Sequence, residues 1–144
     1  GEILLSIVQN SEKLPIIFPA HPRTQKQLFD LKLKHTNLHL VEPISYLEFN
    51  YLVENSKAVI TDSGGITEET TVMKVPCMTI RENTERPETI SIGTNELIGK
   101  DPSAISFALR KLLRGDWKKG SIPELWDGNT GLRIINHLLE ISNI

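Results

Sequence analysis

The sequence predicts a single α/β domain with a three-layer, Rossmann-like arrangement, in which helices cover both faces of a parallel sheet. Short apolar or β-branched runs alternate along the chain with segments of helical periodicity. No linker, repeat or low-complexity segment divides the 144 residues, which is the length of one ordinary domain. Hydrophobic residues make up 39% and charged residues 24%, so a packed core is expected and disorder is not.

Apolar spacing and helix-capping residues predict the individual elements. The first half is expected to contain a helix over 2–10, a strand over 14–20, a helix capped by Thr24 with Leu28, Leu31 and Leu33 on its apolar face, a strand over 38–41, a helix capped by Ser45, and a strand over 57–61. The second half is expected to contain a helix that follows Gly65 and runs to about Lys74, a strand over 76–80, a long polar loop over 81–94 and a strand over 95–98. A helix begun by Asp101-Pro102 is then expected to bury Ile105, Ala108, Leu109 and Leu112, and a final helix runs through Ile134, Ile135, Leu138 and Leu139.

Charge and composition exclude several classes of partner. The formal net charge of −2 gives no electrostatic reason to expect nucleic acid or an anionic membrane surface. No apolar run approaches the roughly 20 residues of a membrane span, and no basic, apolar leader opens the sequence. Cys77, the single cysteine, lies in an apolar run and is expected to be a buried core thiol, which fits a reducing cytoplasm.

The segment 61–69, Thr-Asp-Ser-Gly-Gly-Ile-Thr-Glu-Glu, is the most informative part of the chain. A β-branched strand ends in two glycines, and a helix follows with two acids expected in its first turn. Backbone N–H groups at such a junction are unpaired and lie in the positive field of the helix end. Ser63, Gly64 and Gly65 therefore predict a phosphate cradle as readily as a tight turn.

The two acids after the glycines have different expected roles. For Glu68, the favoured interpretation is a favourable charge at a helix N-terminus. Glu69 lies about one helical turn, roughly 5–6 Å, beyond the glycines, where a carboxylate accepts two hydrogen bonds from a ribose diol while the amides hold the phosphates. The pattern thus suits a nucleotide better than free phosphate.

Further candidates follow other predicted strands, and ligands of doubly wound sheets bind outside the carboxyl ends of the strands. His21, after the first strand, is either a packing histidine or a cation that stabilises a diphosphate leaving group. Arg86, beside Pro87 in the polar loop, is interpreted as a fixed guanidinium facing an anion. Phe49 and Tyr46 have ordinary core spacing, so core packing is favoured over base stacking. The other histidines have no metal-ligand spacing, and no metal or cofactor is expected.

Several segments occur in the order and spacing of one enzyme family. They are Pro-Ala-His-Pro at 19–22, Glu-Pro at 42–43 followed by Tyr46, Leu47 and Phe49, the 61–69 segment, Val75-Pro76, Arg-Glu-Asn-Thr-Glu-Arg-Pro-Glu at 81–88, Gly-Thr-Asn at 93–95 and Leu-Ile-Gly at 97–99. Over nearly its whole length the chain resembles the non-hydrolysing UDP-N-acetylglucosamine 2-epimerases.

This resemblance implies an architecture and a set of roles. The family has two Rossmann-like domains of the GT-B type with the substrate between them, so residues 1–144 resemble the C-terminal, UDP-binding domain alone. The matching residues are the leaving-group histidine His21, the phosphate turn Ser63, Gly64 and Gly65, the ribose carboxylate Glu69, the diphosphate arginine Arg86, and Phe49 beside the uracil. Ile44 departs from the family, because some members have a polar, uracil-holding residue there.

The implied reaction interconverts UDP-N-acetylglucosamine and UDP-N-acetylmannosamine by elimination of UDP and re-addition with inversion at C2. The acidic catalytic residues belong to the N-terminal domain, so this chain alone is expected to be inactive, with UDP, its own N-terminal domain and a second subunit of a homodimer as partners. The alternatives are a hydrolysing epimerase that releases N-acetylmannosamine, a GT-B glycosyltransferase domain, which the 85–88 segment disfavours, and a UDP-sugar-binding module without chemistry.

Overall fold

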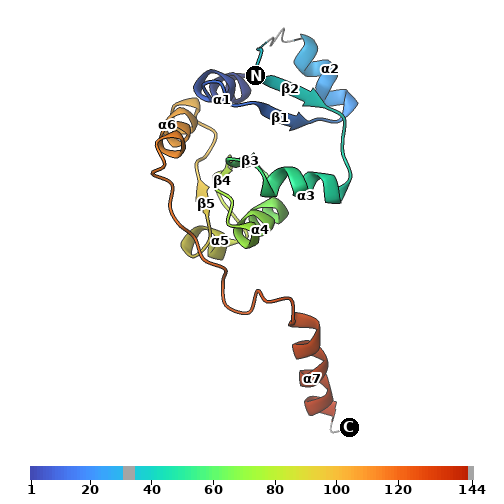
Figure 1. Cartoon of the computed structure of the whole chain (residues 1–144). Helices are drawn as coiled ribbons and strands as arrows, with labels where there is room; N and C mark the ends of the chain where they lie inside the picture. The colour runs from blue at the N-terminus through green and yellow to red at the C-terminus, as the bar shows by residue number, and fades with distance from the viewer. Residues whose placement is uncertain (31–34, 143–144) are drawn as a thin grey trace.

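A computed structural model describes residues 1–30 and 35–142, which alternate between helices and strands (Figure 1). The elements in chain order are α1 (Glu2–Asn10), β1 (Ile16–Pro19), α2 (Pro22–Asp30), β2 (Leu38–Val41), α3 (Tyr46–Glu54), β3 (Val59–Thr61), α4 (Gly64–Met73), β4 (Cys77–Thr79), α5 (Pro87–Ser91), β5 (Asn95–Leu97), α6 (Pro102–Leu113) and α7 (Thr130–Ser142). The predicted α/β class with parallel strands is confirmed, since β1 pairs in parallel with β2, and β4 pairs in parallel with both β3 and β5.

Within the described residues the strands form two hydrogen-bonded sheets, β1-β2 and β3-β4-β5. Ile16 lies opposite Leu38 in the first sheet, and Val59 lies opposite Cys77 in the second. One core nevertheless joins them, because Ile16 of β1 packs against the cluster that contains Met78 of β4. The sequence did not predict this division, since apolar runs define strands but not their hydrogen-bonded neighbours.

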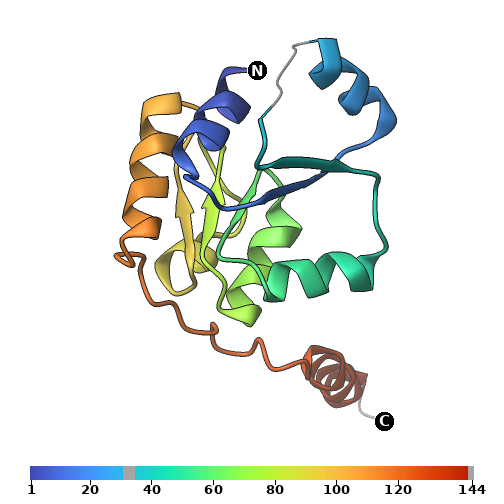
Figure 2. The ribbon, with the colours of Figure 1, turned by 45° about the horizontal axis from the view of Figure 1, so that its top comes forward.

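The two faces of β4 show the layers of the fold. Met78 is buried in a cluster with Ile7 of α1 and Ile105, Ala108, Leu109 and Leu112 of α6. The next side chain, Thr79, faces the other way, toward Asn95 and the α4–α5 side. Figures 1 and 2 both show α1 and α6 side by side on one side of β3-β4-β5, with α4 on the other. All four residues predicted for the buried face of α6 are buried.

Helix ends agree with the sequence where a capping side chain fixes them. Ser45 and Glu48 form a reciprocal capping box at the start of α3, and the Asp101 carboxylate accepts from Ser103 N before Pro102 opens α6. The expected Thr24 cap is wrong, because α2 already begins at Pro22 and the His21 carbonyl accepts from Thr24 N. Leu31 and Leu33, expected on this helix, lie outside the described residues.

Two further expectations near the glycines need correction. The helix α4 starts at Gly64, so both glycines belong to its first turn, and Glu68 and Glu69 lie beyond that turn. The 81–94 segment is not wholly loop, because α5 occupies Pro87–Ser91 with its proline at the first position. A helix of five residues is too short to produce a periodic apolar pattern in the sequence.

The last helix stands away from the rest of the chain. Figures 1 and 2 show α7 at the end of an extended connection, separate from the body formed by α1–α6 and β1–β5. Its apolar side chains are all exposed, from 47% for Leu139 to 64% for Ile141. The expected final helix is therefore present, but its apolar face covers no core in the part of the chain that the structure describes.

Candidate functional site

The amino end of α4 lies directly beyond the carboxyl end of β3. Thr61 closes the strand, Ser63 is the N-cap residue, and its N–H donates to Thr61 Oγ1 at 3.0 Å. No side chain among the described residues caps this helix. The N–H groups of its first turn therefore have no acceptor within residues 1–30 and 35–142, and they point toward the carboxyl edge of the sheet, where they favour a negative group.

Neither the backbone conformation nor the packing of neighbouring atoms requires glycine at positions 64 and 65. Neither glycine has a positive φ angle, so each position accepts another residue type without strain. A Cβ added to Gly65 would meet no atom within 4 Å, and one added to Gly64 would lie 3.4 Å from the Glu85 carboxylate. Glycine at these positions therefore leaves open space over the first-turn amides, as close approach of a bulky anion requires.

The loop after β4 passes beside this helix end. Arg81 Nη2 donates to Glu85 Oε1 at 3.0 Å, and the other oxygen of Glu85 is the group that faces Gly64. Because β3 and β4 are parallel neighbours, the segments that follow them meet at one edge. The structure thus brings two of the three predicted strand-end features together.

Arg86 contacts α4 through Glu68. Its Nε donates to Glu68 Oε1 at 2.5 Å, and its Nη1 donates to the Glu85 carbonyl at 3.2 Å. The interpretation of Glu68 as a charge at the helix N-terminus is therefore wrong, since this carboxylate lies beyond the first turn and pairs with the loop arginine. Spacing along α4 alone gives no signal of this pair, because its two members are 18 residues apart.

Glu69 borders a cavity of about 310 Å³ together with Tyr46, Glu68, Val72, Met73 and Trp126. Within the part of the chain that the structure describes, no protein group donates a hydrogen bond to its carboxylate. The aromatic residues of this cavity are Tyr46 and Trp126, while Phe49 is half-buried elsewhere on α3. Sequence reasoning missed Trp126, because nothing local indicates that the connection before α7 returns to α3 and α4.

His21 lies just beyond the carboxyl end of β1, as predicted, in the separate two-strand sheet. His21 is exposed, and its backbone carbonyl accepts hydrogen bonds from Thr24 N at 2.8 Å and Gln25 N at 3.0 Å. Among the described residues, no hydrogen bond or ion pair joins the His21 imidazole to Ser63, Glu69 or Arg86. Its leaving-group role therefore remains an expectation.

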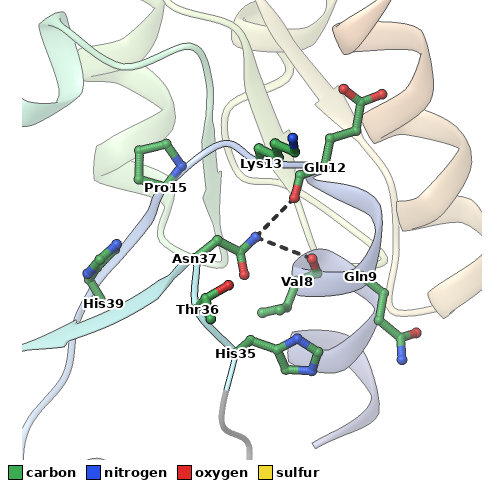
Figure 3. A pocket seen from close by; sticks show the side chains of 9 residues that line it. All are labelled: Val8, Gln9, Glu12, Lys13, Pro15, His35, Thr36, Asn37 and His39. Atoms are coloured by element: carbon green, nitrogen blue, oxygen red, sulfur yellow. Dashed lines mark hydrogen bonds between the residues drawn. The ribbon is translucent and has the colours of Figure 1, made fainter.

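A second cavity, of about 490 Å³, lies at the opposite, amino end of β1 and β2. Figure 3 shows Asn37 at its centre, with the side-chain amide directed at the carbonyl groups of Val8 and Glu12, and the same nitrogen also contacts Ser11 Oγ at 2.9 Å. Asn37 therefore holds the end of α1 against the start of β2. Ligands of parallel α/β sheets bind at the other edge, so this cavity does not replace the α4 site.

Other site chemistries find no support in the described residues. No group of three His, Cys, Asp or Glu side chains there is placed to hold a metal ion. Burial raises the pKa of the Cys77 thiol to about 11, so at neutral pH it is a protonated core residue, as predicted, and not a nucleophile. None of the described helices combines the length and the apolar character needed to cross a bilayer.

Known proteins with similar sequences cover almost the whole chain. The family model for UDP-N-acetylglucosamine 2-epimerase matches residues 1–139. The chain belongs to this epimerase family. A UDP-N-acetylglucosamine 2-epimerase from Methanococcus maripaludis is 47% identical over 145 residues, which cover 94% of this chain and 38% of that protein.

Solved structures of the epimerase family are similar to this chain in fold as well as in sequence. One from Neisseria meningitidis, bound to UDP-GlcNAc, has a TM-score of 0.74 at 31% identity and covers 96% of this chain and 40% of its own. Another from Methanocaldococcus jannaschii, in complex with UDP-GlcNAc and UDP, has a TM-score of 0.73 at 37% identity. The match covers 96% of this chain and 41% of that one. The chain thus has the Rossmann-like fold of one half of a GT-B type epimerase and spans about two fifths of these relatives' length.

Proposed function

We propose that this chain is the UDP-binding, C-terminal half of a non-hydrolysing UDP-N-acetylglucosamine 2-epimerase. The observation that carries the proposal is the uncapped amino end of α4, where two glycines that neither backbone nor packing requires leave space over free amides. Arg86 lies on the neighbouring loop, where it pairs with Glu68 of α4, and Glu69 lies on the next turn of that helix. The relatives with bound UDP-GlcNAc and UDP support a nucleotide diphosphate as the ligand.

Each group has a role that follows from its chemistry. The Ser63 hydroxyl, the N–H groups of Gly64 and Gly65 and the Arg86 guanidinium bind the diphosphate. The Glu69 carboxylate accepts hydrogen bonds from the ribose diol. Phe49 lies toward the uracil, and the His21 imidazole stabilises the charge that develops on the departing UDP. Fixed donors and dipoles of this kind favour elimination, because they are already oriented when the charge appears.

In the proposed reaction, a base removes the proton at C2 of the sugar while the bond between C1 and the UDP oxygen breaks. The products of this step are a glycal and UDP. UDP then re-adds at C1 and a proton reaches the opposite face of C2, which inverts that centre. This chain holds UDP throughout, and side chains of the N-terminal half carry both proton transfers. Water capture of the glycal instead would release N-acetylmannosamine, and product analysis separates that hydrolysing alternative.

The N-terminal half is the proposed partner, within a homodimer of the full-length protein. The apolar side chains of α7 support this proposal, because an amphipathic helix with every apolar residue exposed is stable in a protein only when another surface covers it. If instead the chain acts as a binding module without chemistry, UDP binds and no such partner is required.

Calorimetric titration with UDP, uridine and inorganic phosphate tests the proposed site. We expect UDP to bind at least about tenfold more tightly than either control, since only UDP uses both subsites. Gly65→Leu should weaken UDP binding without affecting uridine, because the side chain would fill the open space over the first-turn amides. Gly131→Leu is the matched control, since Gly131 is also the second residue of a helix with open space around it. Equal binding of UDP and uridine by the folded chain would overturn the diphosphate assignment.

A further inference from the structure

We propose that Glu68 is a positioning residue, which fixes the Arg86 guanidinium beside the amino end of α4 in the orientation that binds the diphosphate. This inference rests on the proposed function and adds a residue to it. Glu68 itself touches no part of the nucleotide in this proposal. It acts only through Arg86.

The backbone of Arg86 is held from the core. Its N–H donates to Thr84 Oγ1 at 3.1 Å, and its carbonyl accepts from Thr89 Oγ1 at 2.7 Å. Thr89 in turn accepts from Asn95 Nδ2 at 3.1 Å, and Asn95 Oδ1 accepts from Thr79 at 2.8 Å. Thr79, Thr89 and Asn95 are almost completely buried, so β4, β5 and α5 jointly fix the point from which the Arg86 side chain starts.

The side chain beyond that point is long and half-exposed, with several rotatable bonds. Its position is set by the 2.5 Å hydrogen bond from Nε to Glu68 and by the 3.2 Å bond from Nη1 to the Glu85 carbonyl. Both contacts leave Nη2 without a protein acceptor among the described residues. A guanidinium held at Nε keeps donors on its other side for a second anion.

Glu68 is also in the right place along α4. It lies four residues after Gly64, so the two residues share one face of the helix. Glu85 faces Gly64 on that same side, and Arg86 follows it. The loop segment 85–86 is therefore held along the face of α4 that leads to the free amides, whereas Glu69 lies on the adjoining face.

A purely structural ion pair is the competing explanation. The side chains of Glu68 and Arg86 are 38% and 43% exposed, and ion pairs at such exposure contribute little to folding stability. Removal of Glu68 should therefore leave the fold intact, and its effect should appear in ligand binding. The two explanations also differ in what they expect of Glu68→Gln, because glutamine keeps a hydrogen-bond acceptor for Arg86 Nε but loses the negative charge.

The test is titration of the full chain and its variants with UDP and with uridine. Glu68→Ala should weaken UDP binding about tenfold and leave uridine binding unchanged, because uridine has no diphosphate for Arg86 to contact. Glu68→Gln should stay within about threefold of the unsubstituted chain. In an Arg86→Ala background, Glu68→Ala should have no further effect. Glu54→Ala, an exposed helical carboxylate on α3, controls for the change in net charge.

Tighter UDP binding by Glu68→Ala, equal losses for UDP and uridine, or additive effects of Glu68→Ala and Arg86→Ala would each overturn the positioning role. If the unsubstituted chain fails to distinguish UDP from uridine, the proposed function itself is wrong. If Arg86→Ala weakens UDP binding and Glu68→Ala does not, only the Glu68 proposal is wrong. The NMR resonance of Arg86 Nε–Hε gives a ligand-free readout, and we expect Glu68→Gln to preserve its position and Glu68→Ala to shift it.

Discussion

At the scale of single residues, the adjacent carboxylates Glu68 and Glu69 on α4 have different surroundings. Glu68 is paired with Arg86 through a 2.5 Å hydrogen bond, while Glu69 borders the cavity shared with Tyr46 and Trp126. The sequence predicted a ribose role for Glu69 from its distance to the glycines. It could not predict the pairing of Glu68 with Arg86, since that depends on a loop contact across the fold rather than on helical spacing.

Glu69→Ala should weaken UDP and uridine binding in parallel, because both ligands carry the ribose diol. Loss of hydrogen bonds to a charged acceptor corresponds to about tenfold to hundredfold in affinity. A direct check compares UDP with 2′-deoxy-UDP by calorimetry. The unsubstituted chain should prefer UDP, and Glu69→Ala should bind both alike. A variant that still prefers UDP would show that another group contacts the 2′-hydroxyl.

At the scale of elements, the connection after α6 crosses the start of β5. Trp117 Nε1 donates to the Thr94 carbonyl at 2.8 Å, and Ser121 N donates to the Ile92 carbonyl at 2.8 Å. Between these bonds, Gly120 lies directly on the backbone of Gly93 and Thr94. The crossing thereby fixes the corner between α5 and β5, next to the buried Thr89 and Asn95 that support Arg86.

Gly120→Ala should therefore destabilise the chain. The added Cβ would lie 2.3 Å from the Gly93 carbonyl carbon and 2.5 Å from Thr94 N, which are backbone atoms that cannot rotate away. Overpacking of this kind costs about 1–3 kcal/mol, measured as the free energy of unfolding in urea. Gly131→Ala provides the control, because its Cβ would enter open space. Equal stabilities of the two variants would show that the 117–121 segment is not closely packed in solution.

The elements themselves were largely predictable, and the failures have physical causes. Capping residues placed the starts of α3 and α6 correctly, because a side-chain hydrogen bond fixes the first residue of each helix. The start of α4 was predicted two residues too late, because no side chain caps this end and glycine does not mark a helix start in the sequence. The pairing of strands into two sheets and the contact of Trp126 with α4 depend on long-range packing, which no local pattern encodes.

At the scale of the whole molecule, α7 is the element that this chain leaves unpacked. Its apolar residues share one side of the helix, and all are exposed: Leu132, Ile134, Ile135, Leu138, Leu139 and Ile141. The bidentate pair of Arg133 with Asp127 holds the first turn of the helix against its own connection, and hydrogen bonds from Arg133 lower the pKa of Asp127. The helix is thus fixed locally while its apolar side has no cover.

If an N-terminal half covers this side, substitutions on α7 should affect association and not folding. Ile135→Glu with Leu138→Glu should leave the unfolding free energy of the chain within about 0.5 kcal/mol, because neither side chain packs against the body. The same pair should weaken binding to the N-terminal half of the Methanococcus maripaludis relative at least about tenfold, measured by calorimetry, since two charges would be buried at an apolar contact. Asn136→Glu with His137→Glu, on the polar side of α7, adds the same charges and should leave binding near that of the unsubstituted chain. Equal losses for both pairs would mean that repulsion by net charge, and not the apolar face of α7, controls the association.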